Sequence, residues 1–120
     1  MSQTKVVNQE NGQILMDSGK WADTFLTRLK GLLRCKYLAP GDGLIIEPCN
    51  MVHSLGMSIP IDVLFVSRDH EILHIIDTMR PNRFSPCIKQ ARYVVELPAG
   101  QVHTTETRVG HRLSFLYNDR

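Results

Sequence analysis

Five short apolar runs, separated by turn-forming residues, constrain this fold more than any other feature of the sequence. Residues of this kind, bounded by Gly, Pro, Asn, Asp and Ser, are typical of β-strands. Strands this short usually close into a small barrel-like or folded-over antiparallel sheet, so we expect a mainly β (α+β) domain. The runs are GLIIE at 43–47, IDVLFV at 61–66, EILHII at 71–76, YVVEL at 93–97 and RLSFLY at 112–117.

One segment ahead of these runs has a helical pattern instead. Trp21, Phe25 and Leu29 recur at the spacing of one helix face. Gly31 suits the left-handed residue that often ends a helix. We therefore predict one N-terminal helix over about residues 20–30, which buries these three side chains.

The runs at 61–66 and 71–76 are joined by the short link SRDH, which predicts an antiparallel hairpin. His70 in this link tolerates a positive φ better than most residues. Strand alternation also predicts which side chains are largely buried, because alternate residues point to opposite faces. We expect this core to contain Leu44, Ile46, Val63, Phe65, Ile75, Val95 and Phe115.

The length and charge of the chain restrict its class. With 120 residues, it has the size of one domain and can bury a core without disulfide or metal staples. Residues 1–13 are polar, and we expect them to be flexible or to form a weak first strand with QILM at 13–16, so that 14–120 form a single β-rich domain. The net charge of +2 comes from scattered basic residues, a balance that argues against nucleic acid as a partner.

The cysteines and the hydropathy pattern predict a cytoplasmic protein. Three widely spaced cysteines are an odd number and form no disulfide framework, so reduced thiols are the simpler interpretation. The N-terminal residues lack the long apolar stretch of a signal peptide. No window approaches the roughly 20 apolar residues of a membrane span, so we expect no membrane partner.

The stretch CNMVHSLGM at 49–57 raises the question of metal or thiol chemistry. Cys49 and His53 have the spacing of a metal-ligand pair, but the sequence has no second pair with suitable spacing. No thiol-protease or nucleophile-elbow signature surrounds Cys49. We therefore expect no metal and no cofactor, and the sequence assigns no catalytic residue.

Asp62 is the most informative polar residue, because it interrupts an apolar strand. Inside an apolar strand it persists only if its acceptors are filled, because an unpaired buried carboxylate costs on the order of several kcal/mol. We therefore predict that Asp62 is buried and hydrogen-bonded and that it holds the loop at 49–60 against the sheet. Arg34, Arg92, His53 and backbone N–H groups are the candidate partners. Glu96 in YVVEL raises the same question.

Three segments in this order resemble the domain of unknown function 192 family. They are WADTFLTRLKGLLR at 21–34, HSLGMSIPIDVLFVSRD at 53–69 and ARYVVELPAGQVHTTETRVGHRLSF at 91–115. Three positions depart from the family pattern: Leu33 replaces a frequent Met, His70 a usual turn Gly, and His111 a usual Asp. The resemblance implies a compact, β-rich fold and supplies no reaction.

Two functional hypotheses follow. The first is a non-catalytic module that binds a small molecule or a protein in a cleft near residues 49–62, with Met51, Leu55 and Met57 as an apolar wall. The second is a hydrolytic or metal-dependent enzyme that uses Cys49, His53 and Asp62. The binding residues predicted for the first hypothesis are Arg34, His53, Met57, Asp62 and Glu96.

A third hypothesis, nucleic-acid binding, is the weakest because the overall charge is small. The residues it would use are Arg80, Arg83, Lys89 and Arg92. The sequence does not indicate an oligomeric state.

Overall fold

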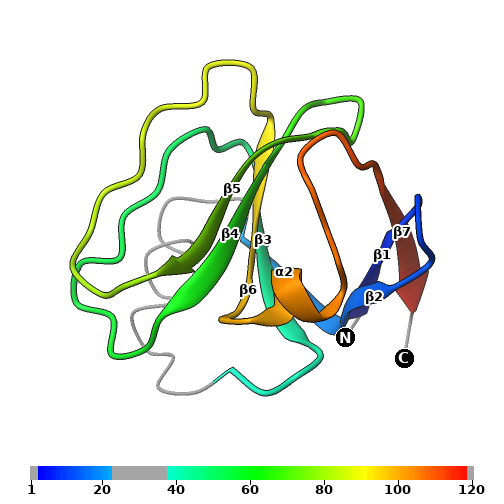
Figure 1. Ribbon diagram of the computed structural model, residues 1–120, viewed down its shortest axis with the longest axis horizontal. Coiled ribbons are helices and arrows are strands. Elements are labelled where there is room, and N and C mark those ends of the chain that lie inside the picture. The colour runs from blue at the N-terminus through cyan, green and yellow to red at the C-terminus, as the bar shows by residue number, and fades with distance from the viewer. Residues whose placement is uncertain (1–2, 23–37, 119–120) are drawn as a thin grey trace.

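The structure is a computed structural model that describes residues 3–22 and 38–118. Its strands form one seven-stranded sheet that curls into a half-barrel, in the order β5-β4-β6-β3-β2-β1-β7 (Figure 1). The prediction of a mainly β domain is therefore confirmed. The strands are β1 Gln3–Asn8, β2 Ile14–Ala22, β3 Asp42–Ile46, β4 Ile61–Val66, β5 Ile72–Met79, β6 Tyr93–Pro98 and β7 Leu113–Asn118, and helix α2 spans Gln101–Thr104.

The predicted hairpin is confirmed. Strands β4 and β5 pair antiparallel, with Leu64 opposite Ile75. His70 in the connecting turn has a φ of 68°, a conformation that His tolerates better than bulky residues do. Strand β4 also pairs antiparallel with β6 along its whole length, so β4 lies in the interior of the sheet.

The predicted N-terminal helix is wrong at its start, because the first element is strand β1 and residues 20–22 belong to strand β2. Trp21 pairs with Ile45 in the parallel β2–β3 ladder, and its indole N–H donates to the Thr4 hydroxyl at 2.6 Å. These pairings outweigh the helical spacing, since propensity is weaker than tertiary context. Residues 23–30 of the predicted helix lie outside the described residues. Within the described ranges, no helix is long and apolar enough to cross a membrane.

Strand β1 lies within segment 1–13. Val6 in β1 pairs with Met16 in β2 on one side and with Phe115 in β7 on the other. A turn with Gly12 at a φ of 75° then leads into β2. The first and last strands of the chain are thus neighbours in the sheet.

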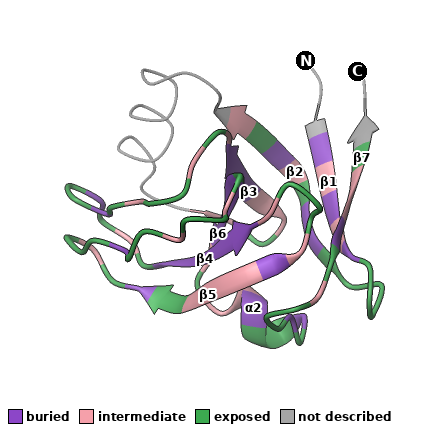
Figure 2. Cartoon of the chain, turned by 90° about the horizontal axis from the view of Figure 1, so that it is seen from above, coloured by how far each residue is buried: buried purple, intermediate pink, exposed green. Residues whose placement is uncertain are grey.

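The two faces of the sheet carry two separate apolar clusters. Figure 2 shows how buried residues are distributed along the strands and α2. The inner core takes residues from all seven strands and from α2: Val6, Leu15, Met16, Ile45, Leu64, Val66, Ile72, Tyr93, Val95, Leu97, Val102 and Leu113. The loop core lies on the opposite face of β3–β6 and contains Leu44, Ile46, Met57, Ile61, Val63, Phe65, Met79 and Val94. Segments 47–60 and 80–92 contribute side chains to the loop core, among them Cys49, Val52, Ile59, Ile88 and Ala91.

Five of the seven predicted core residues are buried. The other two, Ile75 and Phe115, are partly buried and pack against the inner core. Phe65 is fully buried, on the face that the strand alternation predicted together with Val63.

Candidate functional site

Asp62 is fully buried in β4, and backbone N–H groups donate hydrogen bonds to both of its carboxylate oxygens. The N–H of Thr78 donates to Oδ1 at 2.8 Å, and those of Gly100 and Val102 donate to Oδ2 at 3.1 and 2.9 Å. The predicted burial and hydrogen bonding of Asp62 are confirmed. Its position corrects one expectation, because Asp62 joins the end of β5 to the start of α2 and not the loop from 49 to 60 to the sheet.

Glu96 is also buried, in β6, but one of its carboxyl oxygens lacks hydrogen bonds of the kind that Asp62 accepts. It is 1% exposed, and its Oε2 has no hydrogen-bond partner within the described residues. Desolvation by burial raises the pKa of this carboxyl from 4.5 to about 8. Glu96 therefore keeps its proton at neutral pH.

Asp62 and Glu96 lie on opposite faces of the sheet. Glu96 pairs directly with Val63 in β4, and residues paired in this way point to the same face. Val63 belongs to the loop core, so Glu96 faces the loop core as well. Asp62 precedes Val63 and points the other way, toward Val102 of the inner core. The two carboxyl groups consequently belong to no common site.

The loop core is covered by two segments that pair with each other. We call the pair 49–56 and 80–88 the loop ribbon; its two traces run side by side away from β1 and β7 in Figure 1. His53 and Phe84 form an isolated antiparallel bridge within it. The backbone N–H of Ser85 donates to the Val52 carbonyl at 2.9 Å, and that of Ser54 donates to the Arg83 carbonyl at 2.8 Å.

Two buried serines fix the ribbon, and the sequence analysis missed both. The Ser54 hydroxyl donates to the Arg80 carbonyl at 2.7 Å and accepts from the Arg83 N–H at 2.9 Å. The Ser85 hydroxyl accepts from the Val52 N–H at 2.9 Å and donates to the Pro86 carbonyl at 2.9 Å. Ser54 lies in the HSLGM segment that carries the family resemblance, and Ser85 lies in none of the quoted segments; in neither case does the sequence signal that the serine is buried.

The outer side of the ribbon is apolar and exposed. Met51 and His53 alternate with the inward-facing Val52 and Ser54, so these two point away from the sheet. Leu55 follows in the turn from Ser54 to Met57 and is exposed as well. Met51 is 52% and Leu55 40% exposed, and Phe84 is the most exposed at 67%. The His53 and Phe84 rings are tilted against each other at 5.9 Å between centroids. Of the predicted apolar wall, Met51 and Leu55 lie on this surface, whereas Met57 is buried in the loop core.

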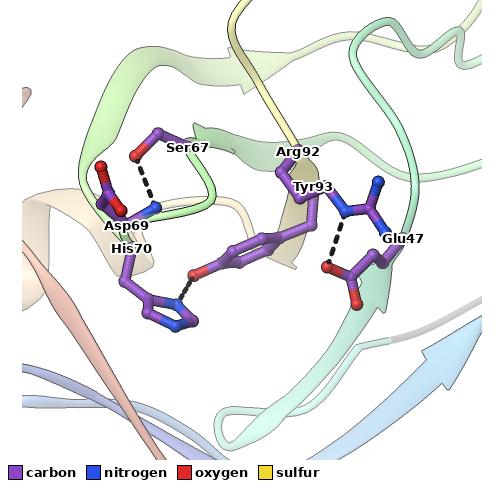
Figure 3. A network of polar contacts seen from close by, with 6 residues as sticks. All are labelled: Glu47, Ser67, Asp69, His70, Arg92 and Tyr93. Carbon is purple, nitrogen blue, oxygen red and sulfur yellow. Dashed lines mark hydrogen bonds and ion pairs between the residues drawn. The ribbon is translucent and has the colours of Figure 1, made fainter.

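An open hollow of about 270 Å³ adjoins one end of the ribbon. Arg92 at its edge is 3.4 Å from Glu47, and both side chains remain partly exposed (Figure 3). In the same view, the next residue, Tyr93, points away from this pair and meets His70 Nδ1 at 2.8 Å through its hydroxyl. The hollow is lined by Pro48, Cys49, Asn50, Met51, Ala91 and Arg92.

The residues proposed for catalysis are not assembled. Asp62 lies in the inner core region, on the other side of the sheet from the ribbon that carries His53. The Cys49 thiol donates to the Met51 carbonyl at 3.2 Å. The described part of the chain contains no group of three or more His, Cys, Asp or Glu residues that could hold a metal ion.

The predicted binding residues are also divided among three places. His53 lies on the outer side of the ribbon, Met57 and Glu96 face the loop core, and Asp62 faces the inner core. Arg34 lies outside the described residues. Among the predicted binding residues that the structure describes, His53 alone is exposed, on the outer side of the ribbon.

Two solved structures have the same fold. A protein from Sinorhizobium meliloti 1021, described as a candidate transcription regulator, has a TM-score of 0.81 at 23% identity, over 96% of this chain and 94% of that one. A protein of unknown function from Novosphingobium aromaticivorans has a TM-score of 0.80 at 20% identity, over 92% of this chain and 82% of that one. At these identities the similarity establishes the fold alone.

Similar sequences occur in archaea. A UPF0127 protein of Pyrococcus furiosus is 28% identical over 116 residues, which are 92% of this chain and 97% of that protein. A UPF0127 protein of Thermococcus kodakarensis is 25% identical over 92% of this chain and 72% of that protein. The DUF192 family model, described as "Uncharacterized ACR", matches residues 6–115, and the chain therefore belongs to the domain of unknown function 192 family.

Proposed function

We propose that this chain is a non-catalytic binding domain whose binding surface is the outer side of the loop ribbon with its adjoining hollow. The observation that carries the proposal is the grouping of exposed apolar side chains there. Six large apolar side chains are exposed in the described residues, and three of them, Met51, Leu55 and Phe84, lie on the ribbon. Grouped exposed apolar residues commonly mark interaction sites.

The backbone beneath these side chains supports a binding role rather than a mobile loop. Ser54 and Ser85 are buried and hydrogen-bonded, so the backbone that carries the outward side chains is held in place. A surface that is ordered before binding loses less conformational entropy when a ligand arrives. His53 and Arg92 add polar groups at the apolar surface and at the hollow.

The occupant in this proposal is a small molecule or a protein, and the location is the cytoplasm. The exposed thiol of Cys87 supports a reducing compartment, because exposed thiols are oxidised elsewhere. The enzymatic alternative receives no support from the positions of Cys49, His53 and Asp62, which lie on different sides of the sheet.

A thermal-shift screen against a metabolite library tests the proposal, because a ligand that binds the folded state raises its melting temperature. Met51→Ser and Phe84→Ser should abolish the shift that a hit produces. Leu116→Ser, which removes an exposed apolar side chain from β7, is the matched control and should leave the shift intact. A ligand whose shift survives both ribbon substitutions would place the binding site elsewhere and contradict the proposal.

A further inference from the structure

Positive charge is concentrated in the two segments that form and flank the ribbon. Segments 47–60 and 80–92 contain four of the fourteen Arg and Lys residues of the chain and one of its twelve Asp and Glu residues. The rest of the chain is therefore slightly acidic, although the whole chain has a net charge of +2. The four cations are Arg80, Arg83, Lys89 and Arg92, and the single anion is Glu47.

Three of these cations have no carboxylate partner within the described residues. Arg92 forms the ion pair with Glu47. The Arg83 guanidinium donates instead to the carbonyl oxygens of Pro81 and Asn82, each at 3.3 Å, and retains further N–H donors. Arg80 and Lys89 are exposed and form no ion pair with any described residue. Segments 47–60 and 80–92 together therefore carry a net charge of +3.

The cations lie at both ends of the apolar row. Arg80 and Arg83 are at one end, where their backbones bond to Ser54. Lys89 is at the other end, directly after Ile88, whose N–H donates to the Asn50 carbonyl at 2.8 Å. An apolar centre with a charged rim is the usual composition of a protein–protein interface.

The shape of the row indicates an extended occupant. Met51 and His53 stand two residues apart, about 7 Å at 3.3 Å per residue, and Leu55 follows them in the turn that the Met57 N–H closes on the Ser54 carbonyl. An extended peptide presents its own side chains at the same two-residue interval. The row is open to solvent along its length, so a small molecule would bury little area there. A second copy of this chain is disfavoured, because a twofold contact would bring the uncompensated cations together.

We propose, on the basis of the binding function above, that the ribbon docks an extended acidic segment of another protein. This segment carries two or three apolar side chains flanked by Asp or Glu. The apolar side chains cover Met51, Leu55 and Phe84, and the carboxylates meet Arg80, Arg83 and Lys89. Because these cations are exposed, their contribution to binding is screened by salt.

The test is selection of peptides from a random library displayed on phage, with the full chain as bait at low ionic strength. Selected peptides are then titrated in labelled form. We expect enrichment of Asp and Glu around apolar residues. Phe84→Ser should weaken binding about tenfold or more, as truncation of an interface anchor does. Arg83→Gln should weaken binding less, and mainly at low salt. Leu116→Ser is the control and should leave binding unchanged.

Several outcomes would overturn the inference. One is the absence of acidic enrichment among the selected peptides. Another is equal binding to the Phe84→Ser variant. The third is preferential binding of the chain to vesicles that contain anionic lipid. Small molecules whose thermal shift depends on Met51 or Phe84, without any selected peptide, would refute the peptide inference and leave the binding function standing. Failure of both experiments would refute both proposals.

Discussion

Glu96→Gln should remove a loss of stability that the wild-type chain suffers as pH rises. Burial raises the pKa of Glu96 in the folded state to about 8, from an ordinary value of 4.5. The folded state therefore holds this proton more tightly than the unfolded chain does. Between these two values the unfolded state binds fewer protons, so the free energy of unfolding falls with rising pH. The contribution of Glu96 is most favourable below pH 4.5 and is lost as pH rises through about 8.

The size of the effect follows from linkage. Each pH unit between the two pKa values costs about 1.4 kcal/mol, and the change levels off near the folded-state pKa. From pH 5 to pH 8, Glu96 should lower the free energy of unfolding by about 3–4 kcal/mol. Gln has nearly the same shape and no ionisable proton. The free-energy difference between variant and wild type should therefore shift by this amount in favour of the variant over the same range.

Urea denaturation at pH 5, 6, 7 and 8 would measure this difference. The fluorescence of Trp21, the single tryptophan of the chain, reports unfolding because its ring packs 5.7 Å from that of Phe115. Glu10→Gln, at an exposed position, is the matched control and should run parallel to the wild type. The slope with pH is the quantity compared, since the amide group introduced by Glu96→Gln can add a constant offset.

Parallel pH profiles for the wild type and Glu96→Gln would refute this reasoning. They would mean that Glu96 is ionised in the folded protein, as a charged partner or water within reach would make it. Greater destabilisation of the variant at pH 8 than at pH 5 would have the same meaning.

Four further predictions concern stability and metal. Phe65→Ala should cost about 3–5 kcal/mol in urea denaturation, because it empties a fully buried site; a loss below about 1 kcal/mol would contradict the packing. Asp62→Ala should cost about 3 kcal/mol, near the top of the range for orphaned donors, since three N–H groups lose their acceptor. His53→Ala should cost less, because its ring is exposed. Elemental analysis of protein purified without added metal should find no stoichiometric zinc; zinc that disappears in Cys49→Ala would contradict the binding-domain proposal.

The parts of the fold that follow from sequence are those with strong local signals. Strands β4 and β5 are predictable because two apolar runs flank a four-residue link. Strand β2 is not predictable in this way, because Trp21 fits a helical spacing as well as a strand. Its pairing with Ile45 depends on tertiary structure, which the local sequence does not reveal. Asn8 in β1 shows the same limit. It is a buried polar residue whose side chain bonds to Thr107 and His111, about a hundred residues away in sequence.

The candidate site was predictable in kind but not in arrangement. The burial and hydrogen bonding of Asp62 follow from a carboxylate within an apolar strand. Its separation from Glu96 depends on the register of β4 against β6, which a single sequence does not supply. The ribbon depends on contacts between residues 50–54 and 83–88, and these residues carry no periodic pattern.

The pairing of β1 with β7 has a consequence for how this domain folds. The ladder runs from Gln3 opposite Asn118 to Asn8 opposite Leu113, so it joins residues separated by most of the chain. Contacts of such high sequence separation slow folding, because a long loop must close before they form. During synthesis, β1 lacks one neighbour until the last strand has been made. Its open edge is then available to pair with strands of other chains, so truncation of β7 should promote aggregation even where the remaining core is intact.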